Sequence, residues 1–131
     1  MRVIAMLLIG LFVGVLGTVT LMNVLRSETP YNHTVMNVLG EQMGALRGMR
    51  ESKQCDVAES TRRLTLLHAI AGEVDGAFLP VGDDDAFRKH SAAMQARIAD
   101  ALAAPPADCA ALVATSKSIG ATCKACHEQF R

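Results

Sequence analysis

The chain has 131 residues, enough for one domain or for one domain with an appendage. Half of its residues are hydrophobic, a fifth are charged, and 13 basic residues balance 13 acidic ones, so the formal net charge is zero. This composition excludes disorder and a disulfide-dense miniprotein, and the absence of a basic surplus argues against nucleic acid as a partner.

The first predicted element is a helix over residues 3–25, which contain no charged residue and lie between Arg2 and Arg26. Such a helix would be about 35 Å long, enough to cross a bilayer core of about 30 Å. The apolar run exceeds a typical signal-peptide core, and no small-residue cleavage site follows it. The sequence therefore predicts an uncleaved transmembrane anchor over residues 1–26, in contact with the lipid bilayer through residues 3–25.

Residues 27–131 are expected to form an all-α domain, a four-helix bundle. Apolar residues recur there at alternating spacings of three and four, the pattern of amphipathic helices packed side by side. The expected helices span roughly residues 29–51, 56–79, 84–104 and 108–130. Short connections between them predict up-down-up-down topology. In that topology the start of the first helix, the end of the second, the start of the third and the end of the fourth meet at one pole.

Particular residues set the limits and the buried faces of these helices. Asp56 and Asp108 are expected to cap the second and fourth helices, and Asp84 places a carboxylate at the start of the third. Five glycines lie inside the helical runs, and several of them are expected to mark the close approach of a helix or of a bulky ligand; the five are Gly40, Gly44, Gly72, Gly76 and Gly120. The residues expected to face the core are Met36, Leu39, Met43, Leu46, Val57, Leu64, Leu67, Ala71, Val74, Phe78, Phe87, Met94, Ile98, Ala101, Leu112, Ile119, Cys123, Cys126 and Phe130.

Two cysteines, Cys55 and Cys109, lie in the first connection and at the start of the fourth helix. Up-down-up-down topology brings these two positions to the same pole. In an oxidising compartment this favours a Cys55–Cys109 disulfide, which would close a loop of about 55 residues and contribute about 4 kcal/mol. The alternative is two separate buried thiols.

The strongest chemical signal is Cys123-Lys124-Ala125-Cys126-His127, near the C-terminus. C-x-x-C-H is the attachment sequence of c-type haem. Two thiols three positions apart on a helix point to the same side and can bond the two vinyl groups of one porphyrin, and the adjacent His127 can bind the iron. A thioredoxin-like motif would need a βαβ setting, and a zinc site would need further ligands. We therefore expect one covalent haem c held by Cys123, Cys126 and His127.

The haem also sets the expected location of the protein. Bacteria attach haem c outside the cytoplasmic membrane, so the bundle would face that compartment. Together with the predicted anchor, this places the chain in the bacterial inner membrane as a single-pass protein whose haem domain lies in the periplasm.

The chain resembles the cytochrome c′ family, four-helix bundles with C-x-x-C-H near the end of the last helix. The resemblance covers most of residues 30–131 and is most specific over residues 120–131 (GATCKACHEQFR) and 36–46 (MNVLGEQMGAL). In Met-ligated members, a first-helix methionine at the position of Met36 supplies the sixth iron ligand, whereas in high-spin members that position only packs over the haem. The resemblance thus implies Met36 as the sixth ligand, and it allows a homodimer.

The expected topology independently places Met36 at the pole where His127 lies. His33, one turn earlier, is the alternative ligand, because imidazole also binds iron well. Arg131, one turn after His127, is a candidate to pair with a haem propionate. His90 belongs to the same pole and is expected at its rim.

These features predict an electron carrier rather than an enzyme. A haem with ligands on both faces cannot readily bind substrate, and the sequence has no carboxylate pair in a recognisable setting, no Gly-rich phosphate loop and no nucleophile elbow. The expected partners are other redox proteins or respiratory complexes of the membrane. One alternative is a high-spin sensor or scavenger of NO or CO, which needs the sixth site empty or weakly held by Met36. Another is a non-catalytic accessory subunit of a respiratory complex.

Overall fold

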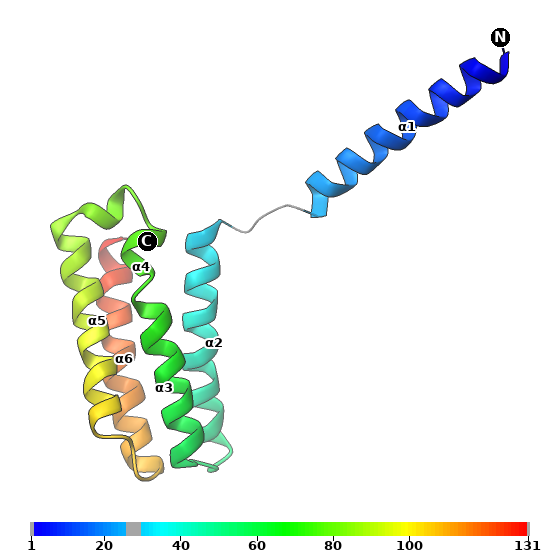
Figure 1. Cartoon of the computed structure of the whole chain (residues 1–131). Coiled ribbons are helices and arrows are strands. Elements are labelled where there is room, and N and C mark those ends of the chain that lie inside the picture. Colours follow the sequence, from blue (N-terminus) through cyan, green and yellow to red (C-terminus); the bar gives the residue numbers. More distant parts are fainter. Residues whose placement is uncertain (1, 26–29, 131) are drawn as a thin grey trace. The chain divides into compact units, whose positions relative to one another are not determined.

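The computed structural model describes residues 2–25 and 30–130, with the side chains of residues 4, 6, 7 and 9–22 in the first helix. Its elements are helices, coloured along the chain in Figure 1. The chain divides into two units, Met1–Pro30 and Tyr31–Arg131, each of which stands by itself.

The N-terminal unit contains helix α1, Arg2–Leu25. Its described apolar side chains, such as Leu11 and Phe12, are exposed. Thr18 donates its hydroxyl to the backbone carbonyl of Gly14, one turn earlier. This bond satisfies the Thr18 hydroxyl within the helix itself.

The sequence predicted that this segment crosses a bilayer. A membrane-spanning helix needs about 20 consecutive apolar residues, because the hydrocarbon core offers polar groups no partner. Among the residues that the structure describes, no helix combines the length and the apolar character that a crossing requires. The predicted transmembrane helix over residues 1–26 is therefore wrong, as is the single-pass inner-membrane location that depended on it.

The C-terminal unit is a four-helix bundle. Its long helices are α2 (Tyr31–Glu51), α3 (Val57–Ala71), α5 (Asp85–Ala103) and α6 (Cys109–Gln129). A one-turn helix, α4 (Val74–Ala77), and a 3-10 helix, η1 (Val81–Asp83), lie between α3 and α5. The helix α2 packs against α3 and α6, and α5 packs against the same two helices. Figure 1 shows the long helices alternating in direction, so the predicted up-down-up-down bundle is confirmed.

The second predicted helix, residues 56–79, is interrupted in the structure. The helix α3 ends at Ala71, where Gly72 is its C-cap residue, and α4 follows after a short turn. Further on, Gly82 lies so close to the backbone carbonyl of Asp75 that a Cβ at position 82 would collide with it. The prediction of one continuous helix is therefore wrong, because a turn at Gly72 and Glu73 separates α3 from α4.

The core follows the inner faces of the long helices. Most of the predicted core residues are buried. Met36, Met43, Cys123 and Phe130 are half-buried and pack against the core. Val57 is 42% exposed, because it is the first residue of α3, and its predicted core position is wrong. The buried apolar residues are Val35, Leu39, Leu46, Leu64, Leu67, Ala71, Val74, Phe87, Met94, Ile98, Ala101, Leu112 and Ile119.

Carboxylates cap three of the long helices. The side chains of Asp56 and Asp108 each accept a hydrogen bond of 2.7 Å from the backbone N–H three residues later. Asp84 accepts two, from the backbone N–H groups of Ala86 and Phe87, at 2.9 and 3.0 Å. The caps predicted for the second and fourth helices are confirmed, and they satisfy N–H groups that have no partner within the helix.

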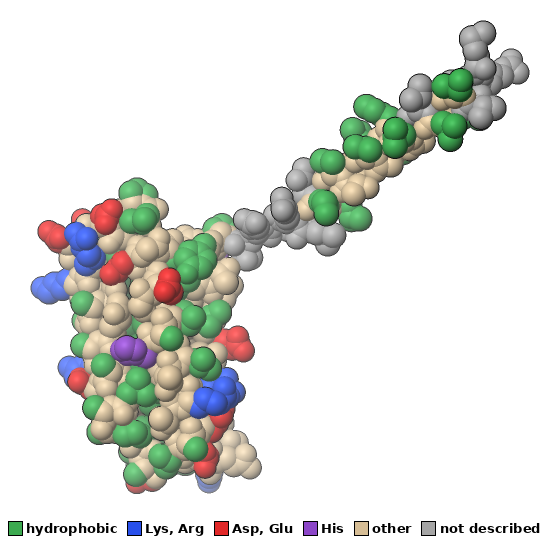
Figure 2. Space-filling view, viewed as in Figure 1, with side chains coloured by type: hydrophobic (Ala, Val, Ile, Leu, Met, Phe, Trp, Pro, Cys, Tyr) green, Lys and Arg blue, Asp and Glu red, His purple; other side chains and the backbone are tan. Residues whose placement is uncertain are grey.

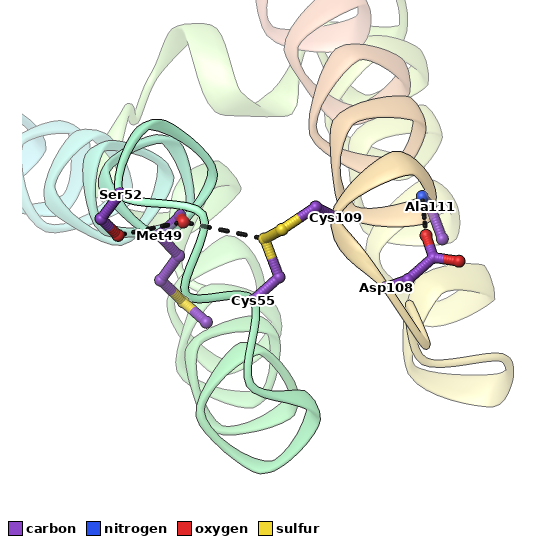
Figure 3. The surroundings of a disulfide bond; sticks show 6 residues. All are labelled: Met49, Ser52, Cys55, Asp108, Cys109 and Ala111. Atoms are coloured by element: carbon purple, nitrogen blue, oxygen red, sulfur yellow. Dashed lines mark hydrogen bonds between the residues drawn. A yellow bond between two sulfur atoms is a disulfide. The ribbon is translucent and has the colours of Figure 1, made fainter.

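A disulfide joins Cys55, in the α2–α3 connection, to Cys109, the first residue of α6. The two Cα atoms are 5.2 Å apart, within the usual range for such a bond. Beside it, the backbone carbonyl of Met49 accepts a hydrogen bond from the Ser52 hydroxyl at 3.1 Å and lies 3.7 Å from the Cys55 Sγ (Figure 3). We refer to this end of the bundle as the disulfide pole.

The surface of the bundle carries charges of both signs. Figure 2 shows acidic and basic side chains interspersed over the visible face, with apolar groups between them. Arg88 pairs with Asp85 at 3.3 Å on α5, and Lys124 pairs with Glu128 at 3.6 Å on α6. This mixture agrees with the zero net charge of the sequence.

Candidate functional site

A cavity of about 280 Å³ lies between the helices of the bundle. Most of its lining is apolar, and Leu39, Leu67, Ile98 and Ile119 contribute to it from α2, α3, α5 and α6. We refer to the end of the bundle where α6 finishes and α2 begins as the cavity pole. An enclosure built from several helices with few polar groups is typical of a site for a largely apolar ligand.

The helix α6 places Cys123, Cys126 and His127 on this lining. Residues three and four positions apart occupy the same face of a helix, so the C-x-x-C-H spacing turns all three side chains toward one space. Both thiols are free and half-buried. The structure thus brings the three predicted attachment residues together at one cavity.

Burial sets the chemistry of the two thiols. It raises the pKa of both Cys123 and Cys126 above the ordinary value for a thiol, because the apolar surroundings disfavour the thiolate. A thiol with a raised pKa is a poor redox nucleophile at neutral pH, because few of its molecules are thiolate. No group of three or more potential metal-binding side chains occurs within the described ranges. These observations count against the zinc and thioredoxin-like interpretations of the motif.

The helix α2 contributes the candidate sixth ligand. Met36 lies half-buried on the same cavity lining as the residues of α6. His33 is exposed and lies off the lining, and its backbone N–H donates to the Asn32 side-chain oxygen at 2.9 Å. The structure therefore places Met36, and not the alternative His33, on the same cavity as His127.

Two other predicted residues have different outcomes. Arg131, the candidate partner of a haem propionate, lies outside the described residues. His90 of α5 is half-buried and lines the cavity, with its Nε2 3.1 Å from the Oε1 of Gln129. Its ring also meets that of Phe130 edge-on, with centroids 6.0 Å apart. The end of α6 thus holds His90 against the cavity.

Two of the predicted glycines leave room at the site. Gly40 of α2 and Gly120 of α6 line the cavity, and a Cβ built on either would have no atom within 4 Å. A flat ligand can therefore approach both backbones closely. Gly44 and Gly76 also have nothing near a built Cβ and lie off the lining, so neither of them marks a close approach.

Sequence reasoning missed Arg47, an exposed residue of α2 that lines the cavity. The sequence does contain a signal for Arg47. Spacings of four, three and four residues separate Met36, Gly40, Met43 and Arg47. Residues with this spacing lie on one face of a helix. A face that begins with a candidate iron ligand extends to an arginine three turns later.

The residues of the cavity fit haem c. Two free thiols and a histidine share one face of α6, and the neighbouring helix α2 offers a thioether sulfur. The lining is mainly apolar, as a porphyrin ring requires, and the open space beside Gly40 and Gly120 has no side chain to obstruct it.

Comparison with known proteins agrees with this site. A sequence model described as cytochrome c′ matches residues 28–131. No curated protein sequence matches the chain.

Solved structures share the fold of the bundle. Cytochrome c′ from Rubrivivax gelatinosus is 20% identical with a TM-score of 0.65, and the match covers 77% of this chain and 91% of that one. Two nitric oxide complexes of variants of cytochrome c prime from Alcaligenes xylosoxidans are both 24% identical, with TM-scores of 0.67 and 0.68. These two matches cover 77% of this chain and 91% and 90% of the other chains. At these identities the likeness establishes the fold.

Proposed function

Since the chain belongs to the cytochrome c′ family, whose haem c is covalently attached, we propose that it carries single electrons. When bound, haem c supplies an iron centre that gains and loses one electron. The observation that carries the proposal is that Met36 and His127 line the same cavity from two different helices. Two such ligands leave no coordination site open to a substrate, so the chain is proposed to be a carrier and not an enzyme.

Each residue of the site has a distinct role in this proposal. Cys123 and Cys126 hold the group covalently, so it cannot dissociate between one electron and the next. The imidazole of His127 and the thioether of Met36 would be the iron ligands, and thioether ligation would raise the reduction potential. The mainly apolar lining around them lowers the local dielectric constant.

A carrier needs partners that supply and accept electrons. We propose other redox proteins or respiratory complexes as the class of partner. The interspersed surface charges allow brief encounters, because a partner is not held by one large patch of a single sign.

Binding of NO is the second candidate function. The two Alcaligenes structures are nitric oxide complexes of their own proteins. In this chain, the open space beside Gly40 could admit a diatomic gas next to Met36. This function requires that Met36 leave the sixth site empty or hold it weakly.

The absorption spectrum of the purified ferric protein separates the two functions. Electron transfer predicts a low-spin spectrum with a methionine–iron charge-transfer band, and Met36→Ala should abolish the band and give a high-spin spectrum. Met43→Ala is the matched control, because Met43 lines the same cavity from the same helix and should leave the band in place. A high-spin wild type whose ferrous form binds NO as readily as Met36→Ala would establish the second function. A low-spin wild type unchanged by Met36→Ala would overturn the ligand assignment.

A further inference from the structure

Arg47 is set apart from the other arginines of the bundle. Within residues 30–130, every other arginine pairs with a carboxylate; these are Arg50, Arg62, Arg63, Arg88 and Arg97. Arg47 has no hydrogen-bond or ion-pair partner among the described residues. It is also the permanently charged residue of the cavity lining, since the remaining lining groups are apolar, neutral or histidine.

A free arginine beside an apolar cavity indicates an anionic ligand. Arginine stays protonated at all physiological pH values and presents a planar fork of donors that matches a carboxylate. Helical side chains lean toward the N-terminus of their helix, so the Arg47 side chain is directed back toward Met43 and the cavity. Its guanidinium group is therefore available to an acidic group at the cavity opening.

Haem supplies such acidic groups. A porphyrin attached through its two vinyl groups carries two propionates on the edge remote from those bonds. The apolar lining offers these carboxylates few donors, and Lys124, between the attachment cysteines, is already paired with Glu128. We propose that Arg47 binds a haem propionate, an inference that rests on the proposed haem c function of this cavity. A charge-assisted, bidentate contact from α2 would then hold the edge of the haem opposite its α6 attachment.

The first test isolates the carboxylates. In the full chain with Cys123→Ala and Cys126→Ala, binding of ferric protoporphyrin IX is compared with binding of its dimethyl ester, which lacks the acidic groups. We expect about a tenfold preference for the diacid, the size of one charge-assisted hydrogen bond. Arg47→Gln should remove this preference and Arg47→Lys should keep part of it. Arg50→Gln is the matched control, because it removes an equal charge one turn away and off the lining.

A second measurement covers the case in which the thiol-free variant does not fold. In the covalent holoprotein, Arg47→Gln leaves a propionate charge uncompensated and should lower the reduction potential, whereas Arg50→Gln should change it little. Equal shifts in the two variants, or a diacid preference that survives Arg47→Gln, would overturn the role of Arg47. Failure of the proposed function has a different signature: acidified organic solvent would extract the pigment from wild type, or the purified chain would hold none.

Discussion

At the disulfide pole, a covalent bond between Cys55 and Cys109 ties the α2–α3 connection to the start of α6. Aspartate caps close the starts of α3 and α6 beside it. At the cavity pole, by contrast, Met36, Cys123 and Cys126 are only half-buried, and two glycines leave open space between the helices. One end of the bundle is closed by its own chain, and the other is built to be completed by a ligand.

The two ends of the bundle thus have different roles. The disulfide pole stabilises the fold, and the cavity pole holds the functional site. The disulfide and the caps fix how the helices pair without touching the cavity, so the opposite end can leave space open without losing the fold. Substitutions at the disulfide pole should therefore change the free energy of unfolding and leave the haem spectrum unchanged. Substitutions on the cavity lining should change the spectrum first.

The largest effect on stability is expected from removing the disulfide. Cys55→Ala with Cys109→Ala opens a loop that spans 54 positions of the sequence, and the added freedom of the unfolded chain should lower the free energy of unfolding by about 4 kcal/mol. Urea denaturation of the holoprotein, followed by circular dichroism, measures this loss. The absorption spectrum should match that of wild type, because neither cysteine lines the cavity.

Two results would contradict the assignment of stability to one pole and of function to the other. A loss of covalent haem or a change of spin state in the disulfide-free variant would show that the disulfide pole shapes the cavity. An unchanged midpoint in urea would show that the caps and helix packing hold that pole without the bond. Wild type treated with a reductant and then alkylated serves as the control, because it opens the same loop without substitution.

Local spacing and topology made both poles predictable from the sequence. The three residues of C-x-x-C-H lie within five positions, so one helix is enough to bring them together. Cys55 and Cys109 are far apart in the sequence, but alternating helices with short connections leave few places for them to lie. Met36 followed from the same topology, since α2 begins at the pole where α6 ends.

Other features depend on tertiary contacts that a sequence pattern does not carry. The break after Ala71 was missed because the apolar spacing continues through Val74 and Phe78, although the chain folds back where Gly82 meets a backbone carbonyl. Arg47 was missed because one arginine on an amphipathic helix is ordinarily a solvated residue, and only its place on the cavity sets it apart. The transmembrane prediction rested on the length and apolar character of the uncharged run over residues 3–25, and no helix among the described residues is long and apolar enough to cross a membrane.

A smaller effect on stability is expected from substituting two glycines of α2, one on the cavity lining and one off it. Gly44→Ala should stabilise the holoprotein by about 1 kcal/mol, because alanine favours the helix and a built Cβ has nothing within 4 Å. Its spectrum should stay that of wild type, because Gly44 is off the lining. Gly40→Ala, one turn earlier on the lining, adds its methyl group to the space that the haem would fill and should shift the Soret band. Urea titration and absorption spectra of both variants test this, and identical spectra would contradict the proposed position of the haem.

The smallest effect on stability is expected from removing an ion pair at the disulfide pole. Glu59, in the first turn of α3, accepts hydrogen bonds from the Nε atoms of Arg62 at 2.8 Å and Arg63 at 2.7 Å. These bonds, that from Arg62 foremost, lower the pKa of the Glu59 carboxyl from 4.5 to about 2. The folded state favours the ionised form of the Glu59 carboxyl more than the unfolded state does. The stability that results is therefore present above pH 4.5 and is lost as the pH falls toward 2.

Glu59→Gln removes this titration, so thermal unfolding followed from pH 7 to pH 2 should show the variant approaching wild type in the acid range. The effect should be modest, because solvent screens an exposed pair. Glu51→Gln is the control, since Glu51 forms only a long contact of 3.8 Å with Arg50 at the end of α2. A constant gap between wild type and Glu59→Gln over the whole range would mean that the arginines do not hold the carboxylate in solution. An unchanged haem spectrum in both variants is expected, because neither glutamate reaches the cavity.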